Sequence, residues 1–363
     1  MPVSLKIIAR KEKFLLLLLL ILLFLSIIKP ENIKNYPRFI HWQTIGILAG
    51  LLLISSGLKD SGVLHILAKR LLSHIHTERK LALFLILLTA FFSSFMTNDV
   101  ALFVVVPLAI SMQNLLSGDV SKIIVFAAIS ANVGSSLTPI GNPQNIFIWQ
   151  KWGISFSSFI LYLFPLTLAL LSILLIFAFL SFRNNRLEIM EKSISFDKFL
   201  AISSFSLIII YLLLLQLDLV FYILPVVFLF YLFLFPSVVK RTDWSLLLIF
   251  IIIFIDFQCI SNLSIIQRIM ENTGMDAFLF STILSQIMSN VPATIFISNF
   301  SNEWLKIAYG VNVGGNGFVI ASLANIIAIR LSKRKLWKEF HKYSLPFFLL
   351  SAIIAYSILQ FIL

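Results

Sequence analysis

The chain has 363 residues, of which 60% are hydrophobic and only 12% are charged, and its mean hydropathy is +1.01. This composition excludes a soluble fold of that length and indicates a polytopic membrane protein. The net charge of +12 would suggest nucleic acid as a partner in a soluble chain. Here the basic residues stand between apolar runs, so they indicate topology, and we expect no nucleic-acid partner.

Nine apolar segments are candidates for membrane spans, which need about 20 residues each. They are 14–28, 40–58, 123–150, 157–182, 199–216, 219–236, 244–262, 303–329 and 344–363. Two further apolar stretches, 81–112 and 277–298, are interrupted near the middle by polar phrases and predict re-entrant hairpins. Basic residues precede the first segment, but no small-x-small cleavage pattern follows it, so we expect an uncleaved anchor.

The distribution of Lys and Arg tests this topology. With the N-terminus in the cytoplasm, 22 of the 28 basic residues fall on the cytoplasmic side and 6 outside. The inside groups are the N-terminal tail, 59–80, Lys122, 183–198, 240–241 and 330–342. This bias is the one that the positive-inside rule predicts. We therefore expect a multi-pass protein of the cell (inner or plasma) membrane, with its N-terminus in the cytoplasm and its C-terminus outside.

The order of these segments predicts two inverted repeats, 40–156 and 244–330. In each, a span precedes a hairpin (81–112 or 277–298) and then an interrupted span (123–150 or 303–329), and the two copies run in opposite directions. Residues 1–39 form the anchor helix and loop, 157–243 the connecting scaffold helices, and 331–363 a basic loop and C-terminal helix. The predicted fold is an all-α polytopic membrane protein with inverted repeats, two re-entrant hairpins and two broken transmembrane helices, as in many secondary transporters.

The interrupted spans carry the polar chemistry. Residues 132–145 combine two prolines, two glycines and three asparagines, so the helix must break there. Its counterpart at 312–317 is rich in glycine and leads to Ser322 and Asn325. Such backbone survives at membrane depth only where protein or water surrounds it. Close packing of small residues is the alternative explanation, but the ordered repetition favours a binding site, because carboxamides can donate to an anion and offer oxygen to Na⁺.

Two of the 16 acidic residues, Asp99 and Asp256, lie well inside apolar sequence. An acid at membrane depth is expensive and is therefore a candidate for H⁺ or Na⁺ coupling. Asp99 stands inside a hairpin phrase, whereas Asp256 has the alternative of bonding a neighbouring helix. The sequence contains no phosphate-binding glycine loop, so we expect no cofactor and no ATP-driven step.

Four phrases together resemble the ion transporter superfamily. They are Thr97-Asn98-Asp99-Val100-Ala101, Asn132-Val133-Gly134 with 138–145, Ser289-Asn290-Val291-Pro292, and Gly310-Val311-Asn312-Val313-Gly314-Gly315-Asn316. That superfamily includes arsenite permeases, NhaD-type sodium/proton antiporters, citrate-transporter-like permeases and divalent anion/sodium symporters. The resemblance covers nearly the whole chain. It implies a transport domain of hairpins and broken helices that moves like an elevator against the other spans.

The resemblance also implies site residues. The substrate would contact Ser94, Thr97, Asn98, Ser289, Asn290, Thr138 and Asn142. The coupling ion would contact Asn98, Asp99, Asn132, Gly134, Asn290, Asn312 and Gly314, and we add Asp256 from its position. Ser289 stands where the antiporter branch tends to carry an aspartate, and 317–321 replaces the usual Thr-Pro-Ile-Gly phrase. These departures argue against two symmetric sodium sites.

The predicted function is secondary active transport of a small anion or oxyanion, of arsenite or citrate/dicarboxylate type, coupled to Na⁺ or H⁺. One alternative is a Na⁺/H⁺ antiporter that uses Asp99. The other is an intramembrane enzyme, for which the sequence offers neither a nucleophile with its base nor a His-rich metal set at depth. The expected partners are the solute, the coupling ion and the lipid bilayer, with a homodimer as an open alternative. No metal is expected beyond Na⁺ at the coupling-ion residues.

Overall fold

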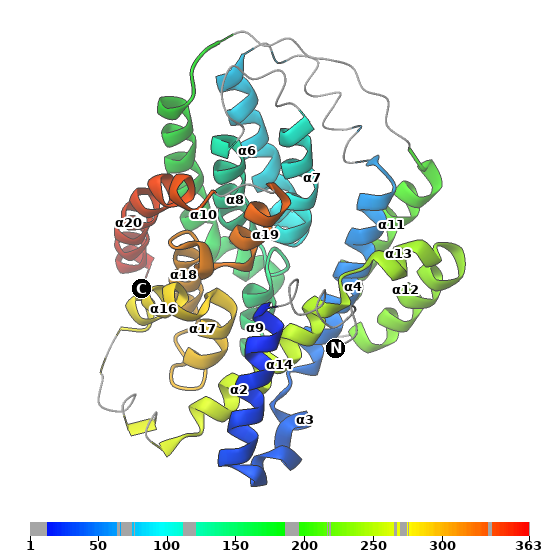
Figure 1. The fold of residues 1–363 in the computed structure, drawn as a ribbon, viewed down its shortest axis with the longest axis vertical. Coiled ribbons are helices and arrows are strands. Elements are labelled where there is room, and N and C mark those ends of the chain that lie inside the picture. The colour runs from blue at the N-terminus through cyan, green and yellow to red at the C-terminus, as the bar shows by residue number, and fades with distance from the viewer. Residues whose placement is uncertain are drawn as a thin grey trace, which may run out of the picture.

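A computed structural model describes residues 13–63, 66, 75, 77–111, 121–185, 196–215, 217, 219–264, 267–268, 274, 276–332 and 336–362. Within these residues the protein is built of helices (Figure 1). The first half contains α2 (Lys13–Ile28), η1 (Pro30–Asn35), α3 (Tyr36–Phe39), α4 (Trp42–Asp60), α6 (Glu78–Phe95), α7 (Asn98–Ser111), α8 (Ser121–Ser135), α9 (Pro143–Trp152) and α10 (Phe156–Ser181). The second contains α11 (Lys198–Leu215), α12 (Val220–Leu234), α13 (Pro236–Arg241), α14 (Trp244–Ser261), α16 (Ala277–Met288), α17 (Asn290–Ile297), α18 (Trp304–Gly314), η3 (Val319–Ala321), α19 (Leu323–Ser332) and α20 (Trp337–Ile362).

Helices lie at each segment for which a span was predicted, and the all-α, multi-pass membrane class is confirmed. In the described part of the chain, α4, α10, α14 and α20 are each long and apolar enough to cross a bilayer alone. The N-terminal pair of α2 with η1 and α3, bent by 117°, would add a fifth crossing. The spans predicted at 123–150 and 303–329 are each two shorter helices separated by a break. Within the predicted hairpins, α6 meets α7 and α16 meets α17 at the polar phrases.

Hydrogen bonds tie together several loops that were predicted to share one side of the membrane. Arg79 donates from Nε to the carbonyl of Phe182 at 2.9 Å, and Lys122 donates to the carbonyl of Ser181 at 2.9 Å. At the opposite end, Lys29 donates to the carbonyl of Asn262 at 3.1 Å. Figure 1 shows α2 and α3 at the end of the molecule away from the outer ends of α6 and α8. These bonds agree with the predicted pairing of the loop ends involved, while the order of the crossings and the assignment of one end to the cytoplasm stay predictions.

The two halves of the chain interlock. The α6–α7 pair packs on α8, and the α16–α17 pair packs on α18. The later half of each broken helix then crosses to the other unit, because α9 packs on α17 and α18 while α19 packs on α7 and α8. Within the first unit, Gly134 allows α8 to lie close against α6, since a Cβ there would lie 2.2 Å from the carbonyl oxygen of Ala90. The unit of α6, α7 and α8 therefore packs on a helix from the second half of the chain, and the unit of α16, α17 and α18 packs on a helix from the first.

A second group of helices flanks the interlocked core, with α4 packed against α11 and α12. In Figure 1 these helices lie side by side to the right of the core. Buried tyrosines join them: the hydroxyl of Tyr211 donates to the carbonyl of Gly46 at 3.0 Å, and the hydroxyl of Tyr231 donates to Ser204 Oγ at 2.8 Å. Since α4 also contacts α7, α9 and α14, it forms the border between this group and the core.

Candidate functional site

Four interruptions of helical backbone define the candidate site. The first broken helix stops with α8 at Ser135 and resumes at Pro143, where the Asn142 side chain caps α9 by accepting from the amide of Asn145 at 2.9 Å. The second stops with α18 at Gly314 and resumes with α19 at Leu323. The two hairpins turn at residues 96–97 and at Ser289. Proline at the first helical position explains why α9 starts where it does.

The tip of the first hairpin is bonded to the first break. Ser94 Oγ donates to the carbonyl of Gly134 at 2.8 Å, and Thr138 Oγ1 donates to the carbonyl of Ser94. The amide of Asn98 donates to the carbonyl of Gly141 at 2.9 Å. Backbone groups that a helix break leaves without partners are therefore satisfied by the hairpin, which fixes the tip against the break.

The tip of the second hairpin is strained. Ser289 has φ 75° and ψ 155°, and it is the only non-glycine residue with positive φ in the described part of the chain. This region of backbone space belongs almost entirely to glycine and costs about 1–3 kcal/mol for another residue. The turn sets the next residue, Asn290, against Gly315, whose missing Cβ would lie 3.0 Å from Asn290 Nδ2. Strain of this kind tends to persist where function requires the conformation.

Asparagines join the two breaks in a reciprocal pattern. Asn132 donates from Nδ2 to Asn325 Oδ1 at 2.9 Å, and Asn312 donates from Nδ2 to Asn145 Oδ1 at 2.8 Å. Ser322 Oγ donates to Asn132 Oδ1 at 3.0 Å, and its counterpart Asn142 donates from Nδ2 to Asn312 Oδ1 at the same distance. Each of Asn312, Ser322 and Asn325 lies 180 positions after its counterpart. Asn132 of the first broken helix is thus bonded by two side chains of the second, and Asn312 of the second is bonded by two side chains of the first.

The same spacing relates the bonds inside each break. Asn145 Nδ2 donates to the carbonyls of Ser135 and Thr138, both at 3.1 Å. Asn325 Nδ2 donates to the carbonyls of Gly315 and Phe318 at 2.9 and 3.3 Å, again 180 positions later. Each asparagine closes the unwound carbonyls of its own break with its amide group and reaches the other break with its oxygen. This equivalence is what a two-fold relation between the halves would produce.

Both hairpin tips meet this network at one point. Asn98 Nδ2 donates to Asn132 Oδ1 at 3.5 Å, and Asn132 Nδ2 donates to the carbonyl of Gly315 at 3.0 Å, beside the Asn290 side chain. These three asparagines are at most 4% exposed. Residues from both halves of the sequence are therefore held in a single buried polar cluster.

Asp99 lies at the border of the cluster, in the first turn of α7, and is 5% exposed. Its amide bonds to Asn98 Oδ1, and its side chain lines a pocket of about 80 Å³ between the core and α4. Ser55 and Lys59 of α4 line the same pocket, together with Arg241. One pocket is therefore lined both by the exposed Arg241 and by the buried Asp99.

The structure brings together almost all of the predicted site residues. Bonds or close approaches link Ser94, Asn98, Asp99, Asn132, Gly134, Thr138, Asn142, Asn290 and Asn312, with Thr97 and Ser289 adjoining them in the chain. Gly314 precedes Gly315, whose carbonyl accepts from Asn132. Asp256 is separate: it is fully buried in α14, and neither carboxylate oxygen has a hydrogen-bond partner among the described residues. Its predicted role and those of the other site residues stay predictions.

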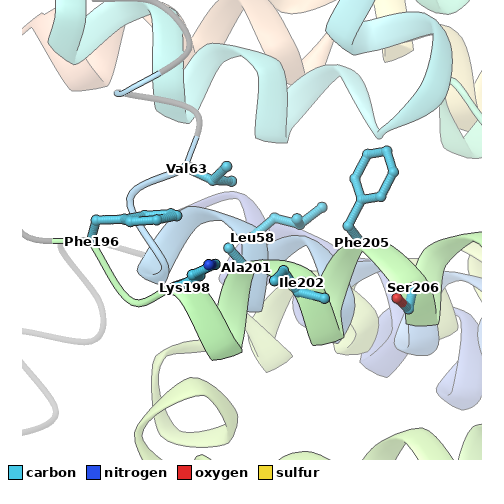
Figure 2. Close-up of a pocket in the computed structure, with 8 residues that line it drawn as sticks. All are labelled: Leu58, Val63, Phe196, Lys198, Ala201, Ile202, Phe205 and Ser206. Atoms are coloured by element: carbon cyan, nitrogen blue, oxygen red, sulfur yellow. The ribbon is translucent and has the colours of Figure 1, made fainter.

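The sequence interpretation did not assign roles to Asn145, Ser322 or Asn325, although they complete the network. The constant spacing of 180 positions from the first break was the signal that could have found them. Figure 2 shows a different feature, a mainly apolar groove of about 320 Å³ between Leu58 at the end of α4 and the start of α11. It contains none of the predicted site residues and lies apart from the asparagine network.

Comparison with known proteins identifies the family of the chain. A family model described as "Citrate transporter" matches residues 5–303. The inner membrane protein YbiR of Escherichia coli is 38% identical over 96% of this chain and 95% of its own length. An uncharacterized transporter of Methanocaldococcus jannaschii is 37% identical over 86% of each chain. The silicon efflux transporter LSI3 of rice is 33% identical over 34% of this chain and 26% of its own. The relatives are named as membrane proteins and transporters rather than enzymes, and the chain belongs to the citrate transporter family.

Proposed function

We propose that this transporter is a secondary active carrier of a small anion or oxyanion, coupled to Na⁺ or H⁺. The solute would bind where the two hairpin tips meet the two breaks. The hairpins and broken helices would form the moving domain of an elevator, and α4, α11 and α12 part of its fixed support. The reciprocal asparagine bonds support the inverted repeats on which this proposal depends.

The convergence of helix ends is the observation that carries the proposal. The cluster lies at the N-termini of four helices, α7, α9, α17 and α19. It also lies at the C-termini of four others, α6, α8, α16 and α18. The N-terminus of a helix carries partial positive charge and free amides, which favour an anion. C-terminal carbonyls favour a cation. Discontinuous helices in transporters bind an anionic solute and its coupling cation in this way.

The side chains of the cluster favour a weakly charged solute. Asp99 is the only ionisable residue among the predicted contacts that the structure gathers, and the others are carboxamides, hydroxyls and glycines. Burial of a multiply charged anion is costly without a neutralising cation. An oxyanion or a hydroxyl-bearing oxyacid therefore fits these residues better than a tricarboxylate does. The partial match to a silicon efflux transporter points in the same direction.

Na⁺/H⁺ antiport through Asp99 is a second candidate, favoured by the pocket that leads to this residue. The pocket of about 80 Å³ has room for a few water molecules or a small ion. An ion could reach Asp99 through it without passing the asparagine cluster. This route would serve either an antiporter or the coupling step of a symporter.

Flux measurements on purified protein in proteoliposomes separate these candidates. We expect arsenite or another small oxyanion to accumulate on a Na⁺ or pH gradient, and Asn98→Ala and Asn290→Ala to abolish uptake while still inserting and purifying. Normal uptake by both variants would refute the assignment of the site. A Na⁺ gradient that changes the lumenal pH without added solute, and that Asp99→Asn prevents, would instead establish antiport.

A further inference from the structure

The buried polar side chains around the breaks fall into two groups by how much of their hydrogen-bonding capacity is used. A carboxamide offers two donors and two acceptor positions. Asn132 uses all four: Nδ2 donates to Gly315 and Asn325, and Oδ1 accepts from Ser322 and Asn98. A saturated group of this kind holds other residues in place and has little capacity left for a ligand.

Three side chains, one at the tip of the first hairpin and one at each break, have a buried oxygen whose hydrogen-bonding capacity is unused. Thr97 Oγ1, Gln144 Oε1 and Asn316 Oδ1 have no hydrogen-bond partner among the described residues. All three residues are at most 2% exposed. A buried acceptor without a donor is destabilising, and native proteins retain few of them. Such atoms therefore need an explanation in terms of what they bind.

Their positions supply that explanation. Thr97 precedes Asn98, whose amide bonds to Gly141, and Gln144 is the second residue of α9, three positions further on. Asn316 lies in the second break, where its Nδ2 is fixed by the carbonyl of Asn312 at 3.0 Å. Each acceptor therefore lies at a helix end of the candidate site.

We propose that Thr97, Gln144 and Asn316 supply the acceptor oxygens that contact the transported species, whereas Asn132, Asn145, Asn312 and Asn325 are positioning residues. The carboxamide oxygens of Gln144 and Asn316 can only accept, so they require a ligand that offers positive charge or hydrogen-bond donors, and the Thr97 hydroxyl can accept from the same ligand. A coupling Na⁺ and the hydroxyl groups of a solute share this chemistry. The inference rests on the proposed function, and it adds Gln144 and Asn316 to the site while transferring Asn132 and Asn312 from ion binding to positioning.

Two glutamines provide a matched test. Gln286 is fully engaged: Nε2 donates to the carbonyls of Gly314 and Thr282 at 2.6 and 3.2 Å, and Oε1 accepts from the amide of Phe318 at 2.9 Å. Methionine replaces the carboxamide with an unbranched apolar chain of similar length. We expect Gln144→Met to raise the Tm of protein purified without added solute, because an unsatisfied polar atom is removed. Gln286→Met should lower it.

Ligand response is the second readout. Wild-type Tm is measured against NaCl with choline chloride as the ionic control, and against arsenite and citrate at constant Na⁺. For at least one probe that shifts wild type, Gln144→Met should show at least a tenfold loss of apparent affinity. A loss confined to NaCl identifies the ligand of Gln144 as the cation, and a loss confined to a solute identifies solute hydroxyls.

Either of two results overturns the inference. One is a Tm of Gln144→Met, measured without added solute, that does not exceed that of wild type, and the other is an unchanged concentration dependence for every probe that shifts wild type. A wild type that neither responds to nor transports any probe would count against the proposed function. The comparison of Tm values without solute would still decide whether Gln144 is unsatisfied, and the absence of a rise would refute the inference.

Discussion

The bond between Asn132 and Asn325 predicts a measurable energetic link between the two halves of the chain. Asn325→Ala removes two donated bonds, to the carbonyls of Gly315 and Phe318, and the acceptor of Asn132 Nδ2. At about 1 kcal/mol for each hydrogen bond, the variant should lose about 3 kcal/mol of stability. Only the last bond is shared with Asn132, so the coupling energy should be about 0.6–1.7 kcal/mol, between the average and the maximum measured for side-chain bonds between helices in a membrane protein.

A double-mutant cycle measures that coupling. Wild type, Asn132→Ala, Asn325→Ala and the double variant are unfolded at equilibrium in mixed micelles by increasing SDS, with tryptophan fluorescence as the signal. The reciprocal cycle uses Asn312→Ala and Asn145→Ala and should give a similar value. The control cycle pairs Asn132→Ala with Tyr231→Phe, which removes a hydroxyl that bonds Ser204 in the flanking helices, outside the asparagine network, and the two changes should be additive. Additivity in both of the cross-break cycles would refute the interlocking of the halves through these bonds.

Three further outcomes follow from the geometry. Ser289→Gly should relieve backbone strain and keep or raise the Tm, whereas Ser289→Ala keeps the strain and should not raise the Tm. A lower Tm for the glycine variant than for the alanine variant would contradict the strained turn. Gly134→Ala should destabilise by about 1–3 kcal/mol or more in the same SDS assay, because its Cβ would meet the Ala90 backbone; a neutral result would contradict the close contact of α6 with α8. Lys306→Met should cost less than about 1 kcal/mol, because its ion pairs with Asp276 and Glu303 are partly exposed, and a loss above 2 kcal/mol would contradict this.

The sequence predicted the helical class and the positions of the helices well, for a physical reason. Apolar runs of about 20 residues have few alternatives in a bilayer, and the basic loops indicate their orientation. The breaks were also predictable, since no uninterrupted helix accommodates Pro139, Gly141 and Pro143 together. In the structure α8 ends at Ser135, before this phrase, and α9 begins at Pro143, the last residue of the phrase.

The partners of the asparagines were less accessible to sequence reasoning. Asn142 and Ser322 play matching parts although their side chains and surrounding phrases differ, so local similarity does not pair them. The exchange of α9 and α19 between the halves is a tertiary feature that no local pattern encodes. The strain at Ser289 was equally hidden, because a serine carries no sequence signal for positive φ. These are the features that bring the hairpin tips to one place.

The most direct test of the account is an experimental density map of the protein with its transported solute bound, obtained by electron cryomicroscopy. The account predicts solute density between the hairpin tips at Thr97–Asn98 and Ser289–Asn290, in contact with both breaks, and the Asn132–Asn325 and Asn312–Asn145 bonds intact beside it. Solute density in contact with only one half of the chain, or bound away from both breaks, would contradict it.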